Sequence, residues 1–244
     1  MAENPLTRPP RVLVPDLATH RGSSEEREIL LRKEERDHVR SRRLRDGTEV
    51  VVLDGKGLRA RGAIARKGTA VALFTFEEGV FGEPAIRVTV ALACAEPARV
   101  EWAIEKGTEC GAAGFVLLDA ERSQRSHVAA LSRRISRLIR IAEEAVKQCD
   151  RTIVPFVEGP KSAEDFLRGL GEEKLLVADP RGAPIASFAP GAPVVVAIGS
   201  EGGFAPAEIS SFGEKSPVFL SLGPRILRLE TAVVVALARL VDPA

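Results

Sequence analysis

Residues 194–204, VVVAIGSEGGF, decide the fold of this chain, and residues 220–231, LSLGPRILRLET, have a similar arrangement. Each stretch is an apolar run that ends in a glycine-containing turn. A run of Val and Ile without polar residues is typical of a buried strand in a parallel sheet. Gly199, Gly202 and Gly203 would let the backbone after the first run approach another molecule closely. We therefore expect two neighbouring loops that bind a ligand.

Outward from these two stretches, strands alternate with helices from about residue 85 onward. The pattern predicts strands at 86–93, 114–118, 174–178, 194–198 and 218–222, and helices at 100–110, 128–149 and 230–241. Pro206 with Glu208 suits the first turn of a further helix directly after the glycine loop. Strands separated by helices indicate βαβ units, so the fold class is α/β with a mostly parallel sheet.

The N-terminal part has a different pattern of predicted elements, with strands separated mainly by turns. Short β-rich runs at 11–14, 49–53, 60–64 and 70–76 are separated by turn signals such as Asp46-Gly47 and Asp54-Gly55, which predicts a small barrel or sandwich. Residues 24–45 carry acids early and arginines late, as a charged surface helix would. The linker-like stretch 77–84 marks the boundary between a domain at 1–78 and a domain at 79–244.

Composition limits the possible functions. The chain has 244 residues, 45% of them hydrophobic, and a formal net charge of +1. Its three cysteines form no CxxC pair, which argues against a zinc site or a disulfide framework and favours a reducing, cytoplasmic location. From this cysteine pattern we expect no metal. No stretch resembles a signal peptide or a membrane span, so we expect no membrane association.

Arginines are bunched at 40–45 and at 122–140, with few acids between them. Basic patches on a nearly neutral protein indicate a polyanion held at defined places, although a solvated helix face explains such runs equally well.

The glycine loops follow neither the GxGxxG nor the GxxxxGK[ST] pattern, so they indicate neither a Rossmann site nor a P-loop. A tight structural turn remains an alternative for the first loop. The second loop is denser, because Ile226, Leu227 and Leu229 alternate with polar residues and could wall an apolar slot for a flat base such as adenine.

Four stretches together carry a resemblance to a known family. IGSEGGF, then LGPRILRLETA, preceded by EKGTECG at 105–111 and by EAVKQCDR at 144–151, resemble the RsmE family of the SPOUT superfamily. These enzymes methylate ring nitrogen 3 of a uridine in 16S ribosomal RNA. The resemblance implies an N-terminal PUA-like RNA-binding β-barrel, a C-terminal methyltransferase domain with a trefoil knot, S-adenosylmethionine as cofactor, and a homodimer. Free 16S RNA or the assembled small subunit would be the substrate.

The resemblance also implies three sets of site residues. The catalytic residues would be Arg228, Arg225, Glu230 and Gln148. The cofactor would be bound by Ile198, Gly199, Glu201, Gly202, Gly203, Leu222, Gly223, Ile226, Leu227 and Arg228. The RNA would be bound by Arg8, Arg11, His38, Arg40, Arg43, Arg45, Arg122 and Arg151.

This chain departs from the family pattern at several of these places. Ser200 stands where the family usually has proline, Leu229 replaces a small or hydroxyl residue, and Ala205 replaces a helix-capping hydroxyl. The stretch after His38 is one residue short, with Arg43 in place of valine.

A mechanism follows from the chemistry of uridine. Its ring N–H must lose a proton before the nitrogen attacks a methyl sulfonium, and arginine donors can stabilise the negative charge on the uracil oxygens. Arg228 or Arg225, with Gln148 and Arg151, is the predicted surrounding of the base, and Glu230 orients an arginine or acts as base. Two alternatives stay open: a related SPOUT enzyme that acts on a ribose 2′-hydroxyl or another base, and a non-catalytic RNA-binding ribosome assembly protein.

Overall fold

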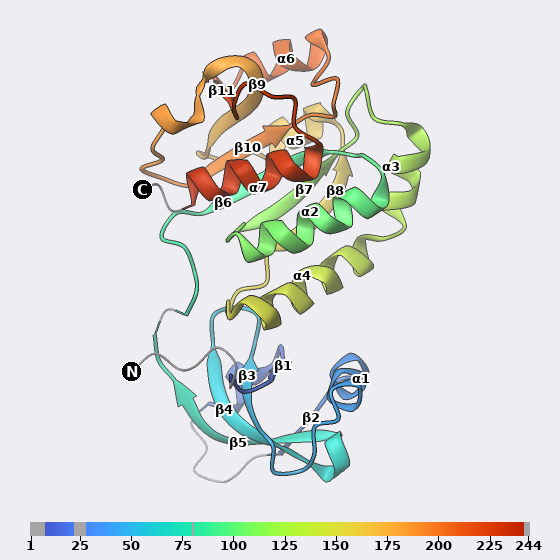
Figure 1. The fold of residues 1–244 in the computed structure, drawn as a ribbon, viewed down its shortest axis with the longest axis vertical. Helices are drawn as coiled ribbons and strands as arrows, with labels where there is room; N and C mark the ends of the chain where they lie inside the picture. Colours follow the sequence, from blue (N-terminus) through green and yellow to red (C-terminus); the bar gives the residue numbers. More distant parts are fainter. Residues whose placement is uncertain (1–7, 22–27, 80, 242–244) are drawn as a thin grey trace. The chain divides into compact units, whose positions relative to one another are not determined.

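The computed structural model describes residues 8–21, 28–79 and 81–241. Its contacts divide the chain into two compact units (Figure 1). The N-terminal unit comprises residues 1–83 together with 146–154, and the C-terminal unit comprises residues 84–145 and 155–244. The segment 146–154, which begins at the valine of the EAVKQCDR motif, thus groups with the first unit.

The C-terminal unit is built on a six-stranded sheet in the order β11-β9-β10-β6-β7-β8. All neighbouring strands run parallel, as the alternation of strands and helices predicted. The strands are β6 Val88–Ala93, β7 Gly114–Leu118, β8 Phe156–Lys161, β9 Lys174–Pro184, β10 Val194–Ile198 and β11 Val218–Ser221. Every residue of β10 is buried, which explains why its sequence excludes polar side chains.

Six α-helices belong wholly or mainly to this unit: α2 Pro97–Glu109, α3 Arg125–Ser132, α4 Ile135–Cys149, α5 Ala163–Gly169, α6 Pro206–Gly213 and α7 Leu229–Leu240. A short 3-10 helix, Ile185–Ser187, follows β9. Helices α2 and α7 pack side by side, and α7 also contacts β6 and β10 (Figure 1). Helix α6 begins at Pro206, as predicted, and Phe212 on it packs edge-to-face against Phe204.

The single helix expected at 128–149 is wrong, because the structure has α3 and α4 in its place. The Ser132 hydroxyl donates to the Val128 carbonyl at 3.0 Å, and the Arg134 N–H bonds to Leu131, one residue closer than in an α-helix. Both contacts tighten the chain at the end of α3. Leu131 of α3 and Leu138 of α4 are both fully buried.

The N-terminal unit contains a curled five-stranded sheet in the order β1-β3-β4-β5-β2 (Figure 1). Its strands are β1 Arg11–Leu13, β2 Glu28–Leu30, β3 Glu49–Leu53, β4 Arg59–Ala65 and β5 Ala70–Glu77, and β1 pairs with β3 in parallel. Helix α1, Lys33–Ser41, and the 3-10 helices Leu17–His20 and Arg66–Gly68 complete the unit. Alternate residues such as Val50 and Val52 fill its core.

The charged helix predicted at 24–45 is shorter in the structure, where only α1, Lys33–Ser41, is helical. Residues 22–27 lie outside the described part, and Glu28–Leu30 form β2. Ile29 and Leu31 are buried while Leu30 between them is 67% exposed, which is the alternation of a strand.

Candidate functional site

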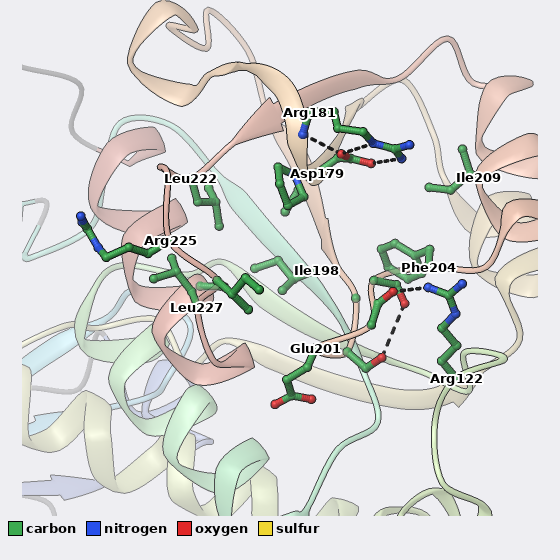
Figure 2. A pocket seen from close by; sticks show the side chains of 18 of the residues that line it. Arg122, Asp179, Arg181, Ile198, Glu201, Phe204, Ile209, Leu222, Arg225 and Leu227 are labelled. Carbon is green, nitrogen blue, oxygen red and sulfur yellow. Dashed lines mark hydrogen bonds and ion pairs between the residues drawn. The ribbon is translucent and has the colours of Figure 1, made fainter.

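A pocket of about 750 Å³ lies in the C-terminal unit where β9, β10 and β11 lead into their following segments (Figure 2). Its wall is formed by the glycine loop after β10, the segment after β11, the middle of β9 and the start of α6. Ile198, Leu222 and Leu227 gather on one side and supply apolar surface. Ligand sites in open α/β sheets lie at this carboxyl edge of the strands.

The glycine loop is shaped by close backbone contacts. A Cβ at Gly199 would lie 2.8 Å from the carbonyl carbon of Gly203, so residue 199 has no room for a side chain. Gly203 has φ +70° and donates its N–H to the Ser200 carbonyl at 2.7 Å, closing a turn. A residue with a side chain is strained at such a φ. Ser200 is thus the first residue of this turn.

Glu208 ties the glycine loop to the loop after β7. It is 8% exposed, accepts from the Ala205 N–H at 2.8 Å as a helix-capping residue, and accepts from the Glu121 N–H at 3.0 Å through its other oxygen. The neighbouring Arg122 donates to the Gly202 carbonyl. Arg122, which we predicted to bind RNA, therefore forms part of the pocket wall (Figure 2).

Arg99 in the first turn of α2 is a site residue that the sequence reasoning missed. Its guanidinium donates to Glu230 Oε2 at 2.8 Å and forms an ion pair with Glu201. It thus joins α2, the glycine loop and the start of α7. Sequence reasoning had no signal for it, because the predicted helix starts at residue 100 and Glu230 is 131 residues away.

The pocket lining holds two carboxylates, Glu201 and Asp179, together with Arg122, Arg181 and Arg225. Burial raises the pKa of Glu201, but hydrogen bonds from its own backbone and from Arg99 outweigh burial, so the net shift is downward. Hydrogen bonds from Arg181 lower the pKa of Asp179, which accepts from that side chain at 3.0 and 2.8 Å. Both carboxylates are ionised at neutral pH. An apolar wall beside charged groups of both signs suits a ligand with a flat apolar part and polar groups.

Nine of the ten residues predicted to bind a cofactor line this pocket: Ile198, Gly199, Glu201, Gly202, Gly203, Leu222, Gly223, Ile226 and Leu227. The tenth, Arg228, lies outside the lining and is the exposed N-cap residue of α7.

The predicted catalytic residues are only partly brought together. Arg225 lines the pocket and is exposed, and Arg228 lies near enough to lower the pKa of Glu201. Glu230 bonds to Arg99. Gln148 is exposed in the last turn of α4, within the segment that groups with the N-terminal unit.

Three of the predicted RNA-binding arginines are held by acids of the N-terminal unit. Arg151, which we predicted to bind RNA, is only 4% exposed and donates to Glu83 at 2.8 Å. Its guanidinium is therefore not available to RNA, and the prediction for Arg151 is corrected. Arg11 binds Asp150 at 2.6 Å with 9% of its side chain exposed, and Arg8 lies 3.7 Å from the same carboxylate. Sequence spacing could not show these partners.

The remaining predicted RNA-binding residues lie on or just after α1. Arg40, Arg43 and Arg45 are exposed and His38 is half-buried. Arg40 forms an ion pair with Asp37 one turn earlier, and Arg43 adopts φ 54° at the end of the helix.

Burial, with a contribution from Asp119, raises the pKa of Cys94 to about 12. Within the described residues, no group of three or more His, Cys, Asp or Glu side chains is placed to hold a metal ion. None of the helices in the described part of the chain is both long and apolar enough to cross a bilayer.

Comparison with known proteins places this architecture. Residues 82–241 match the family model described as RNA methyltransferase domain. The ribosomal RNA small subunit methyltransferase E of Mycobacterium bovis is 32% identical over 208 residues, which cover 80% of this chain and 79% of that protein. This chain belongs to the ribosomal RNA small subunit methyltransferase E family.

One further family member and one solved structure are also similar to this chain. The Bacillus subtilis ribosomal RNA small subunit methyltransferase E is 33% identical, and its match spans 63% of this chain and 64% of that protein. The solved structure of the putative methyltransferase Lpg2936 from Legionella pneumophila, in complex with bound SAM, has a TM-score of 0.81 and 26% identity over 95% of this chain and 96% of that one. The family likeness thus covers both units.

Proposed function

We propose that this protein is an S-adenosylmethionine-dependent methyltransferase that methylates ring nitrogen 3 of a uridine in 16S ribosomal RNA. The observation that carries the proposal is the pocket between the glycine loop and residues 222–227, in a chain of the methyltransferase E family. The Legionella pneumophila relative, which shares this fold, holds SAM.

The pocket residues fit this cofactor. A volume of about 750 Å³ lies within the range of pockets for cofactor-sized ligands. Ile198, Leu222 and Leu227 would flank the adenine, and the backbone around Gly199 approaches too closely for any side chain at that position. Charged groups of both signs, among them Glu201 and Arg225, line the pocket and could contact the polar parts of the cofactor. When bound, the cofactor supplies an electrophilic methyl group on sulfur.

The chain's own residues would hold the uracil ring and manage its charge. Loss of the N3 proton to solvent places negative charge on the two uracil oxygens. Arg225 at the pocket wall and Arg228 at the start of α7 are exposed cations that can stabilise this charge. Glu230, bonded to Arg99, would orient that arginine rather than accept the proton. Arg151 is left out because Glu83 holds it.

The finer architecture belongs to the same proposal. The curled sheet of the N-terminal unit would act as a PUA-like RNA-binding domain, and the segment after β11 would belong to a SPOUT-type trefoil knot. A cytoplasmic homodimer would act on free 16S RNA or on the assembled small subunit.

The test is transfer of tritiated methyl from S-adenosylmethionine to 16S RNA and to intact small subunits, followed by identification of the nucleoside. We expect 3-methyluridine. A 2′-O-methylated nucleoside or another methylated base would replace the proposed specificity with that of a related SPOUT enzyme. Absence of both transfer and cofactor binding would favour an RNA-binding assembly protein.

The catalytic assignment has its own test. Arg228→Ala should abolish transfer while cofactor binding stays measurable by calorimetry, because Arg228 lies outside the pocket lining. Full turnover by this variant would remove Arg228 from the mechanism.

A further inference from the structure

One charged surface is not used by the pocket chemistry. Between residues 122 and 142 the chain has six arginines and no acid: Arg122, Arg125, Arg133, Arg134, Arg137 and Arg140. All six are exposed. We refer to these six residues as the arginine band.

The arginine band begins at the pocket and continues along two helices. Arg122 lines the pocket and donates to the Gly202 carbonyl. Arg125 opens α3, and the other four lie at the α3–α4 junction and on α4, which follow one another in Figure 1. On α4, Arg137 and Arg140 are one turn apart on a face opposite the buried Leu138 and Ala142. The band therefore leads away from the proposed site of reaction.

Few acids neutralise the band. Glu101 of α2 pairs with both Arg134 and Arg137, and Asp119 pairs with Arg125. Arg133 and Arg140 have no acidic partner among the residues that the structure describes. Two acids for six arginines leave a net positive surface at neutral pH.

We propose that the arginine band binds backbone phosphates of the RNA substrate on either side of the target nucleotide. This rests on the proposed function, which names RNA as the ligand. Guanidinium groups bind phosphate with paired N–H donors. Between residues 122 and 142 the chain has no Phe, Tyr or Trp, so the arginines outnumber the side chains of this stretch that could stack on bases. Binding should therefore be independent of sequence and strongly dependent on salt.

The test uses the full chain with Arg133→Gln and Arg140→Gln combined. These two arginines are chosen because their removal leaves no acid unpaired and does not disturb the Glu101 contacts between α2 and α4. The matched control combines Arg87→Gln, directly before β6, with Arg239→Gln on α7, two exposed arginines of the same unit. Binding of transcribed 16S RNA is measured by filter retention over a series of potassium chloride concentrations.

We expect the band variant to bind about tenfold or more weakly near physiological salt, with the slope of log K against log salt reduced by about 1.5. The control should change neither quantity beyond half of that. Equal slopes for the band variant, the control and the unchanged protein would overturn the proposal. So would a change of sedimentation in the band variant with RNA binding intact, which would assign the band to contact with a second copy.

The result is separable from the proposed function. Phosphate binding is read without methyl transfer, and cofactor binding by calorimetry should be equal in both variants. If the unchanged protein methylates no RNA but the slope falls in the band variant, the enzymatic proposal fails and the band remains assigned. If the protein methylates uridine and the slopes are equal, the enzymatic proposal stands and the proposal for the arginine band fails.

Discussion

The arginines of the two units differ in what they contact. In the N-terminal unit, Arg11 binds Asp150, Arg59 pairs with Glu77 and stacks on Phe81, and Arg151 binds Glu83. In the C-terminal unit, the arginine band is exposed and only partly paired. Arginines thus hold the first unit together internally, whereas those of the band form a surface.

The difference teaches that sequence position alone does not show whether an arginine lies on a free surface or binds a distant acid. Arg11 and Asp150 are 139 residues apart, and Arg151 and Glu83 are 68 apart. Only the fold brings each pair together. In the arginine band too, the acid that pairs with Arg134 and Arg137 is distant in sequence, because Glu101 lies on α2.

The largest expected effect concerns a buried pair in the N-terminal unit. Lys147 donates to Glu35 at 2.9 Å, with 3% and 2% of their side chains exposed. Lys147→Met leaves the Glu35 carboxylate buried without this partner, so we expect a loss of about 3–5 kcal/mol in the free energy of unfolding. Urea denaturation measures it.

A matched control lies two turns earlier on the same helix. Arg140→Met should change the unfolding free energy by less than about 0.5 kcal/mol, because Arg140 is exposed. Adding Glu35→Leu to Lys147→Met should restore most of the loss. Similar losses for Lys147→Met and Arg140→Met would erase the contrast between buried and exposed cations.

The second effect tests the correction at Arg151. Arg151→Gln should lower the free energy of unfolding by about 2–3 kcal/mol. The loss is smaller than the one expected for Lys147→Met, because Glu83 keeps its hydrogen bonds from the Thr152 and Ile153 N–H groups at 2.7 and 2.8 Å. The salt slope of RNA binding should be unchanged under conditions where the variant is folded. A slope reduced by about 1 would restore Arg151 as a phosphate contact.

The third effect concerns the one arginine of the C-terminal unit that bridges two acids at the pocket. Arg99→Gln removes charged hydrogen bonds that hold the glycine loop to α7, and such bonds contribute about 1.5–3 kcal/mol each. We expect the cofactor dissociation constant to rise about tenfold or more in calorimetry.

Arg99→Lys should recover part of the affinity, because it keeps one cation between Glu201 and Glu230. Arg239→Gln on the last turn of α7 serves as the control for a change of charge on the same helix bundle. Unchanged cofactor affinity in Arg99→Gln would limit Arg99 to packing.

The elements predictable from sequence were those with a local signal. Strands β3, β7 and β10 match the expected ranges to the residue, because each is an apolar run bounded by turn residues. The glycine loop was predictable for the same reason. Pocket residues Asp179 and Arg181 were missed because β9 continues to Pro184 through polar residues that no apolar pattern marks.

Other features depend on contacts distant in sequence. Strand β2 lies in a charged stretch that favours a helix locally, but its pairing with β5 and the burial of Ile29 override that preference. Strand β8 and helix α5 were not predicted at all. The position of Arg99 required the fold to bring α2, the glycine loop and α7 together.

The smallest expected effect separates surface pairing from surface binding within the arginine band. Hydrogen bonds from Arg137 lower the pKa of Glu101 in the folded state. The pair therefore stabilises the protein fully above the ordinary glutamate pKa of about 4.3, and this contribution is lost as the pH falls through the lowered folded value. Glu101→Gln should cost less than about 1 kcal/mol at pH 7, because Arg137 is exposed. The difference in urea midpoint between this variant and the unchanged protein should shrink toward pH 3.

At neutral pH the Glu101→Gln variant should bind 16S RNA at least as tightly as the unchanged protein, because it frees two arginines of the band. Weaker RNA binding by Glu101→Gln would mean that the ion pairs hold α4 in the position that RNA requires, and that pairing and binding in this unit are one function.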